Sequence, residues 1–255
     1  MPSLSFLLLT FATVPAWAQD VDTPRTLPAE DCFPVEEIKK SLSKFDSLKA
    51  SKRDTVAAEL SLEIALEEGE AMPERYELRD GERVLTVLFD DRNRSVELTD
   101  QLRDVSDAAV MCNVDPAREG RLVSERGYGL AFGMGVRFIE TPGFHTLEDI
   151  EKGLKDGRSH YKKIVGAMGF MVPKFDYIAV AGHDEDKPPR VIAMLAGSDI
   201  GEPAFELFNG GRMVEIDTLE EMGADGIRID ADYYRMNPSP SIETVKRFMG
   251  GDEEG

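Results

Sequence analysis

Cysteine and histidine are scarce in this sequence, which has 2 Cys and 3 His among its 255 residues. No pair of them has the C-x-x-C or H-x-x-x-H spacing with which a short segment holds zinc. The acidic stretches that follow His183 and surround Asp230 lack the glycine that an EF-hand loop needs at its sharp turn. We therefore expect no metal centre built from a local motif.

Signatures of cofactor binding and of an activated nucleophile are also missing. Gly127 and Gly129 are followed by Phe132 where a dinucleotide-binding loop needs its third glycine. Ser198 lacks the two flanking glycines of a nucleophile elbow. The sequence thus predicts no cofactor and leaves any catalytic residue unidentified.

Basic side chains are outnumbered, because 30 Lys and Arg stand against 49 Asp and Glu and the formal net charge is −19. So acidic a chain is repelled at long range by DNA, RNA and other polyanions. We expect no nucleic-acid partner. The excess of acid favours solubility, and an acidic binding surface is the alternative interpretation.

Long apolar runs are absent after the N-terminus. The most apolar stretch there, residues 164–172, has nine residues, two of which are glycine. A helix needs about 20 apolar residues to cross a bilayer. The sequence therefore predicts no transmembrane anchor.

The first 18 residues have the features of a cleavable signal peptide. Residues 4–14 form an uncharged apolar run. Its length lies within the usual range of about 7–15 residues for the apolar region of a signal peptide. Ala16-Trp17-Ala18 supplies the small-x-small pattern that signal peptidase cleaves, so the mature chain would begin at Gln19. No Lys or Arg precedes the apolar run, and a buried N-terminal helix is the alternative. We expect an extracytoplasmic protein, periplasmic or secreted.

If the protein is exported, its two cysteines are expected to form a disulfide. In an oxidising compartment a pair of cysteines usually forms a disulfide. Nothing in the sequence places a histidine beside Cys32 or Cys112 to activate a thiol. A Cys32–Cys112 bridge would close a loop of about 80 residues and stabilise the fold by ~4 kcal/mol in the chain-entropy model. We predict this disulfide.

Helical and antiparallel patterns occupy separate stretches of the chain, which is typical of the α+β class. After Pro34, apolar side chains recur at helical spacing through residue 48. Residues 60–66 instead alternate apolar and polar side chains, as a half-buried strand does. Thr146 begins another amphipathic helix, which we expect to end at Gly157 and to be followed by a separate helix from Ser159.

Two hairpins are predicted, and the first spans residues 76–89. Asp80-Gly81 supplies a two-residue turn in which both residues tolerate a positive φ. Such a turn sets Tyr76 opposite Leu85, and Arg79 opposite Glu82 as a cross-strand ion pair.

The second predicted hairpin spans residues 205–216. A Gly210-Gly211 turn sets Phe205 opposite Ile216 and Leu207 opposite Val214, a better apolar match than an Asn209-Gly210 turn gives. We expect several amphipathic helices to pack on these antiparallel sheets.

The domain organisation follows from composition. Residues 19–34 hold three prolines and few apolar side chains, and are predicted to form an extended leader. Residues 35–249 are expected to form one α+β body, with two subdomains divided near residues 113–120 as the alternative. Residues 250–255 form an acidic tail.

The strongest functional signal is a basic segment within this acidic chain. Its members lie within twelve residues and are Lys152, Lys155, Arg158, His160, Lys162 and Lys163. The apolar, glycine-containing run at 164–172 follows directly, and Lys174 closes it. Cations beside a flexible apolar segment suit an anionic amphiphile, a phosphate-bearing ligand or an acidic partner. A solvated helix face followed by a core segment is the alternative.

We accordingly predict that the protein acts by binding through residues 152–174. The rival hypothesis is an extracytoplasmic hydrolase whose site is assembled from distant residues, including His160 or His183 and carboxylates. Binding is preferred because no local catalytic motif is present.

Overall fold

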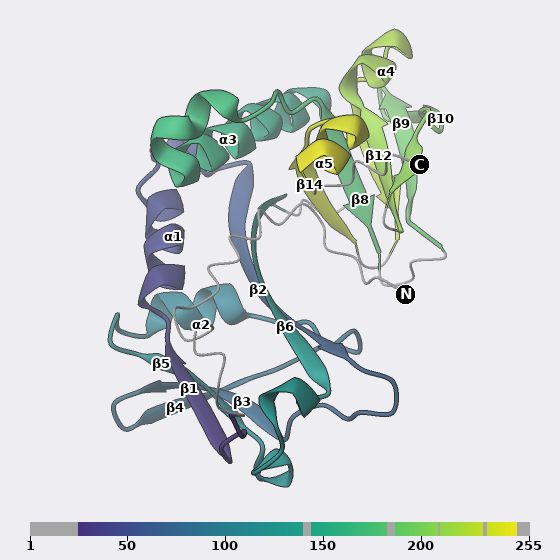
Figure 1. Ribbon diagram of the computed structural model, residues 1–255. Coiled ribbons are helices and arrows are strands. Elements are labelled where there is room, and N and C mark those ends of the chain that lie inside the picture. Colours follow the sequence, from purple (N-terminus) through teal and green to yellow (C-terminus); the bar gives the residue numbers. More distant parts are fainter. Residues whose placement is uncertain (1–24, 140–143, 183–186, 209, 232–233, 249–255) are drawn as a thin grey trace. The chain divides into compact units, whose positions relative to one another are not determined.

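The computed structural model describes residues 25–139, 144–182, 187–208, 210–231 and 234–248 (Figure 1). The predicted signal peptide and its cleavage site, the acidic tail and His183 lie outside these residues. Within them the chain forms antiparallel sheets together with five α-helices. The predicted α+β class is therefore confirmed.

The described chain divides into two compact units. The first, here called the α3 unit, combines Lys44–Ala58 with the chain from Gly135 onward. The second, here called the disulfide unit, combines the residues before Lys44 with Glu59–Met134. The sequence-predicted boundary at residues 113–120 lies inside the disulfide unit. The predicted domain organisation stays a prediction.

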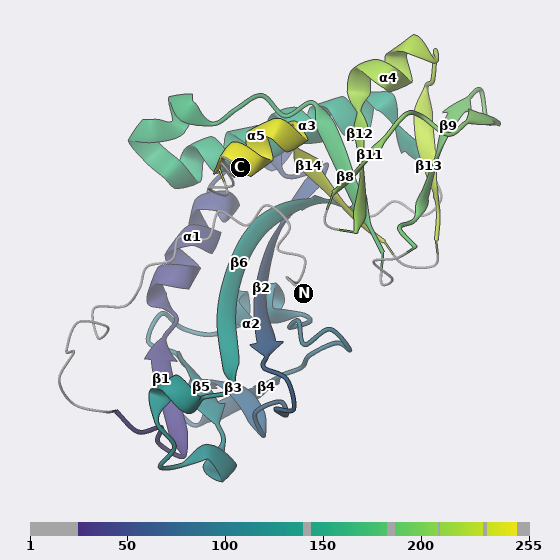
Figure 2. The same cartoon turned by 45° about the vertical axis from the view of Figure 1, so that its right-hand side comes forward.

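Two of the three points of division in the described chain lie in long strands, and the third lies in a helix. β2 (Val56–Leu66) and β6 (Tyr128–Phe138) pair as a two-stranded sheet and run side by side in Figures 1 and 2. The alternating pattern at 60–66 thus correctly predicted part of β2.

The disulfide unit is built on a four-stranded antiparallel sheet of order β1-β5-β3-β4. Its strands are β1 (Glu30–Pro34), β5 (Val110–Val114), β3 (Arg75–Asp80) and β4 (Arg83–Val87). Cys32 of β1 and Cys112 of β5 are register partners, and their sulfurs form the predicted disulfide. The predicted leader therefore ends in a strand that the disulfide fixes to the sheet.

Short helices complete this unit. α1 (Glu36–Asp46) confirms the helix predicted after Pro34, although its last three residues belong to the α3 unit. The others are α2 (Leu98–Asp104) and two 3-10 turns, η3 (Pro116–Arg118) and η4 (Val123–Glu125). Glu36 and Glu37 lie in the first turn of α1 and Lys44 in the last, as the helix dipole favours.

The first hairpin forms with its turn one residue later than predicted, so each cross-strand partner moves by two residues. Asp80 pairs with Arg83 and Tyr76 with Val87, so the turn is Gly81-Glu82 and the predicted Arg79–Glu82 pairing is wrong. Gly81 has φ +61°. With glycine first in the turn, only one residue needs a positive φ, which is the type II′ arrangement.

The α3 unit contains two antiparallel sheets of four strands. The first has the order β10-β9-β13-β7, and the second has the order β11-β12-β8-β14. Their bounds are β10 (Ser198–Gly201), β9 (Arg190–Leu195), β13 (Gly226–Asp230), β7 (His145–Thr146), β11 (Glu206–Phe208), β12 (Gly211–Glu215), β8 (Tyr177–Ala181) and β14 (Arg235–Ser239). A small cluster of Ala179, Met213 and Ile242 belongs to the core of this unit.

The second hairpin also has a register other than the predicted one. Phe208 pairs with Gly211 and Leu207 with Arg212, so the predicted Leu207–Val214 pairing and the Gly210-Gly211 turn that implies it are wrong. β11 is the edge strand of its sheet, and Leu207 is exposed. Pairing of apolar side chains across this hairpin would therefore bury little apolar surface, and it does not set the register.

One helix dominates the α3 unit, namely α3 (Leu147–Val165). The Thr146 hydroxyl caps it by accepting a hydrogen bond from the Asp149 amide at 3.0 Å, as predicted. The predicted end at Gly157 is wrong, because the helix continues to Val165. The remaining helical segments are η2 (Ala50–Lys52), η5 (Gly166–Met171), α4 (Ile216–Glu221) and α5 (Ile242–Phe248).

Gly157 lies inside α3 because that face of the helix packs closely on its neighbours. A Cβ built on Gly157 would lie 2.6 Å from the Pro238 ring, and one built on Gly153 would lie 2.2 Å from the Phe138 ring. Both glycines thus allow close packing within the helix, and neither ends it.

Candidate binding surface

The first two lysines of the predicted site are engaged by carboxylates. Lys152 forms an ion pair with Asp54, and Lys155 forms one with Glu151 at 3.2 Å. Asp54 holds the pKa of Lys152 above its usual range, chiefly through their hydrogen bond. The cationic character of this end of α3 is therefore compensated locally.

Arg158 has a structural partner. Its guanidinium donates two hydrogen bonds, at 2.9 and 3.3 Å, to the carbonyl oxygen of Val172. Val172 follows η5 directly, so Arg158 fixes the end of that turn to α3. Arg158 therefore positions η5 on α3.

His160 does not reach the surface. Its side chain is 0 % exposed, and it packs edge-on against Phe45 with 4.7 Å between the ring centroids. Burial lowers the pKa of His160 to about 4. Neither ring nitrogen has a hydrogen-bond partner among the described residues. A ligand at the protein surface therefore cannot contact this histidine.

Lys162 and Lys163 differ from the other members because they are exposed and form no ion pair with a described carboxylate. Lys44 from the end of α1 is a third lysine of this kind. Lys44 donates to the Ile164 carbonyl at 3.2 Å, and Lys163 donates weakly to the Ser47 carbonyl at 3.4 Å. We call Lys44, Lys162 and Lys163 the lysine rim. It surrounds the C-terminal end of α3, where the helix dipole favours cations.

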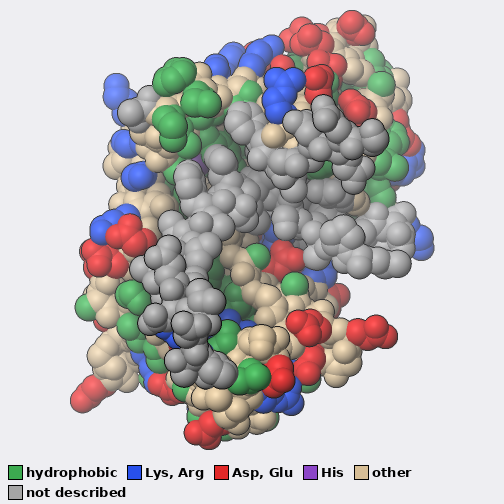
Figure 3. Space-filling view, in the orientation of Figure 1, with side chains coloured by type: hydrophobic (Ala, Val, Ile, Leu, Met, Phe, Trp, Pro, Cys, Tyr) green, Lys and Arg blue, Asp and Glu red, His purple; other side chains and the backbone are tan. Residues whose placement is uncertain are grey.

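Three large apolar side chains lie next to this rim on η5. Phe170 is 82 % exposed, Met168 57 % and Met171 56 %, whereas most large apolar side chains of the described chain are buried. We call these three residues the η5 patch. Figure 3 shows hydrophobic side chains gathered at the upper left, in the region where α3 ends, with Lys and Arg side chains at the margin.

The sequence of η5 explains why these side chains face outward. Gly166 has φ +60° and ends α3, which lets the chain turn back. Gly169 is buried, and a Cβ there would lie 2.9 Å from the Lys162 carbonyl oxygen, so the turn packs directly on α3. Val172 is buried as well. With Gly169 and Val172 inside, the three residues of the η5 patch point to solvent.

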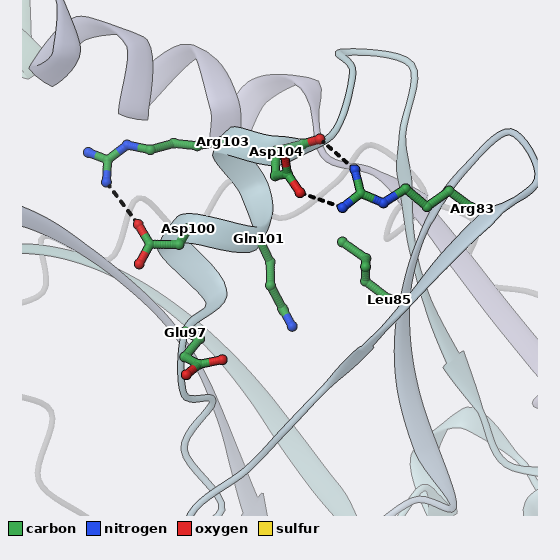
Figure 4. Close-up of a pocket in the computed structure, with 7 residues that line it drawn as sticks. All are labelled: Arg83, Leu85, Glu97, Asp100, Gln101, Arg103 and Asp104. Atoms are coloured by element: carbon green, nitrogen blue, oxygen red, sulfur yellow. Dashed lines mark hydrogen bonds and ion pairs between the residues drawn. The ribbon is translucent and has the colours of Figure 1, made fainter.

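The described part of the chain also has an open pocket of about 520 Å³ in the disulfide unit (Figure 4). Its charged side chains are largely paired with one another, because Arg83 bonds Asp104 and Arg103 bonds Asp100 at 3.3 Å. The lining residues are Arg83, Leu85, Glu97, Asp100, Gln101, Arg103 and Asp104. Because these charges already pair with one another on an open surface, few charged groups remain to bind a ligand. We therefore do not place the functional site in this pocket.

Catalytic or metal chemistry finds little support in the described residues. The group of potential metal ligands found there is Glu30, Cys32 and Cys112, and both cysteines are consumed by the disulfide. His160 has no polar partner, as described above. His183, the other histidine of the hydrolase hypothesis, lies outside the described residues.

Comparison with protein-family models, with curated proteins and with solved structures finds no match to this chain. None of the described helices combines the length and the apolar character needed to cross a membrane. The surface formed by the lysine rim and the η5 patch is therefore the candidate functional site.

Proposed function

We propose that this protein is exported and acts by binding anionic amphiphiles through the lysine rim and the η5 patch. One observation carries the proposal. In a chain with a formal net charge of −19, three lysines without a carboxylate partner in the described residues adjoin three exposed apolar side chains. An acidic head group and an apolar chain are the two chemical features that such a surface complements.

The interactions available there set an upper limit on the affinity. A charge-assisted hydrogen bond from a lysine contributes roughly 1.5–3 kcal/mol. Burying a side chain such as Phe170 or Met168 contributes about 1.5–3 kcal/mol more. A micromolar complex needs about 8 kcal/mol. Two such hydrogen bonds and two buried apolar side chains supply this only if the free-energy cost of association is small. We therefore expect affinity in the micromolar range or weaker.

The net charge of the protein does not prevent binding. Repulsion between the acidic chain and an anionic ligand is screened beyond about 8–10 Å at physiological salt. Lys162 is in contact with η5, since a Cβ on Gly169 would lie 3.3 Å from the Lys162 Cβ. The local cations therefore act at shorter range than the distributed acidic charge.

Export is supported by two observations. The N-terminal 18 residues have a signal-peptide pattern, and Cys32 and Cys112 form a disulfide of the kind that persists in oxidising compartments. N-terminal sequencing of the protein recovered outside the cytoplasm should begin at Gln19. A mature chain that still begins at Met1 would contradict the proposed cleavage.

The binding proposal is tested by calorimetric titration of the mature chain, which begins at Gln19, with laurate below its micelle concentration and with phosphatidylglycerol vesicles. We expect binding in at least one of these presentations. The double variant Lys162→Glu/Lys163→Glu should weaken it by about thirty-fold or more, because each lysine near an anionic surface contributes about five-fold.

The matched control is Lys187→Glu/Lys246→Glu, which makes the same change in net charge at exposed lysines outside the lysine rim. Its affinity should stay within about two-fold of wild type, allowing for long-range screening. Equal losses in both double variants would show a non-local charge effect and contradict the proposed site. Binding of an acidic peptide but of neither amphiphile would assign the surface to an acidic protein partner instead.

A further inference from the structure

We infer that the amphiphile is met as an assembled anionic lipid surface, into which the η5 patch inserts while the lysine rim contacts head groups. This inference rests on the proposed function and specifies its ligand. It depends on the shape of η5, on the position of the lysines and on the way η5 is fixed.

The shape of η5 is that of a projection. A side chain that lines a closed ligand cavity is covered by the opposite wall, whereas Phe170 is 82 % exposed and its two methionine neighbours are more than half exposed. An acyl chain alone in water could contact only one side of such a projection. A bilayer interface can surround Met168, Phe170 and Met171 together, which removes more apolar surface from water.

The lysines lie where a membrane-bound projection needs them. Lys162 and Lys163 form the last turn of α3, immediately before η5 in the chain. Long lysine side chains can place their stems along apolar surface while the ammonium group stays at head-group level. Basic residues around a Phe- and Met-bearing tip combine the two signals, apolar and electrostatic, that reversible membrane binding requires.

A protein partner fits this surface less well. If a second copy docked by two-fold symmetry on the η5 patch, the same surface of both copies would meet, and the like charges of the two lysine rims would be brought into one interface. Lysine is also depleted in protein–protein interfaces, where arginine and aromatic side chains are enriched. Lysines that form no ion pair with a described carboxylate, placed beside an apolar tip, therefore favour lipid.

The tip is fixed before it binds. Arg158 holds the Val172 carbonyl at one end of η5, and the buried Gly169 packs on the Lys162 backbone in its middle. Little conformational entropy is lost when such a turn enters a membrane, because its backbone is already ordered.

The test uses Phe170→Trp in the mature chain from Gln19, which has no tryptophan of its own because Trp17, the one tryptophan of the sequence, lies in the proposed signal peptide. Substitution of the exposed Phe170 should leave the Tm unchanged. On mixing with phosphatidylglycerol vesicles we expect the tryptophan emission to shift to the blue and to be quenched by brominated acyl chains. Phosphatidylcholine vesicles should produce at least about ten-fold weaker binding, because the lysine contribution is absent.

The matched control is Leu207→Trp in the same mature chain, which places tryptophan at an exposed apolar position of the same unit on β11. Its emission should not shift. Vesicle binding without a shift at position 170, or with an equal shift at position 207, would overturn the insertion of η5. Lysine-dependent binding of monomeric laurate without any vesicle binding would overturn this inference but leave the proposed function standing. Binding of neither would overturn both.

Discussion

His160 makes the stability of the α3 unit depend on pH. Burial against Phe45 and Tyr161 lowers its pKa to about 4, and the charge of Asp46 opposes this only in part. The unfolded chain has the ordinary value of about 6.5. Between these two values the unfolded state binds more protons, so the free energy of unfolding falls as the pH falls from about 6.5 to 4.

We therefore expect His160→Leu to flatten this dependence. The wild-type protein should lose about 3 kcal/mol over that range through His160 alone, at ~1.4 kcal/mol per pKa unit. Carboxylates such as Glu77, whose pKa Arg79 lowers, titrate in both proteins and cancel in the difference. Denaturant unfolding of both chains at several pH values gives the measurement. Parallel curves for the two proteins would contradict the assignment.

The basic segment shows which properties of a charged side chain the spacing of residues in the sequence predicts and which it does not. The sequence correctly placed the predicted residues along a helical stretch, but not their partners. Asp54, which pairs with Lys152, is 98 positions away in the chain, and no local pattern reveals it. Burial of His160 likewise depends on Phe45 from a separate helix. Lys162 and Lys163 entered the sequence prediction because they belong to the same segment, whereas Lys44 of the proposed surface did not.

The glycines of α3 lead to a prediction with an unusual sign. Gly→Ala inside an exposed helix stabilises it by up to about 1 kcal/mol. At Gly153 the new Cβ would lie 2.2 Å from the buried Phe138 ring. We expect Gly153→Ala to destabilise the protein by about 1–3 kcal/mol through overpacking.

Thermal unfolding followed by circular dichroism measures this effect, and Ser159→Ala on the same helix is the control. Adding Phe138→Leu should recover part of the loss, because the smaller side chain vacates the space that the Cβ enters. A raised Tm for Gly153→Ala would show that the helix is not packed on β6 as described.

The same glycines explain where prediction of the elements failed. Gly157 resembles a helix end in the sequence, and only the Pro238 ring beside it shows why a glycine is needed within the helix. Both hairpins were predicted from the sequence, but each predicted register was wrong, because the position of the turn sets the register. Gly81 as the first turn residue moves the turn of the first hairpin by one position and its cross-strand partners by two. The exposed edge strand β11 provides no apolar pairing that would favour the predicted register of the second hairpin.

For the whole molecule, the disulfide provides the test of stability. Cys32 and Cys112 are 80 positions apart, and their bond connects β1 to the centre of its sheet through β5. Closing a loop of this length stabilises a fold by about 4 kcal/mol in the chain-entropy model. Reduction should lower the free energy of unfolding by roughly 2–4 kcal/mol in a denaturant titration.

Intact mass after alkylation without reductant should show no labelled cysteine. Two labelled thiols in freshly isolated protein would show that the bond does not form, and the argument for an oxidising compartment would lose one of its two supports.

The binding account is tested most directly on the unmodified protein by methionine oxidation. Met168 and Met171 are more than half exposed, so dilute peroxide should convert both to sulfoxides readily. Phosphatidylglycerol vesicles should slow the oxidation of both by covering the η5 patch, while the partly exposed Met222 of the same unit keeps its rate. Peptide mass spectrometry over a time course gives the three rates. Unchanged rates at Met168 and Met171, under conditions in which the protein sediments with the vesicles, would contradict the central claim.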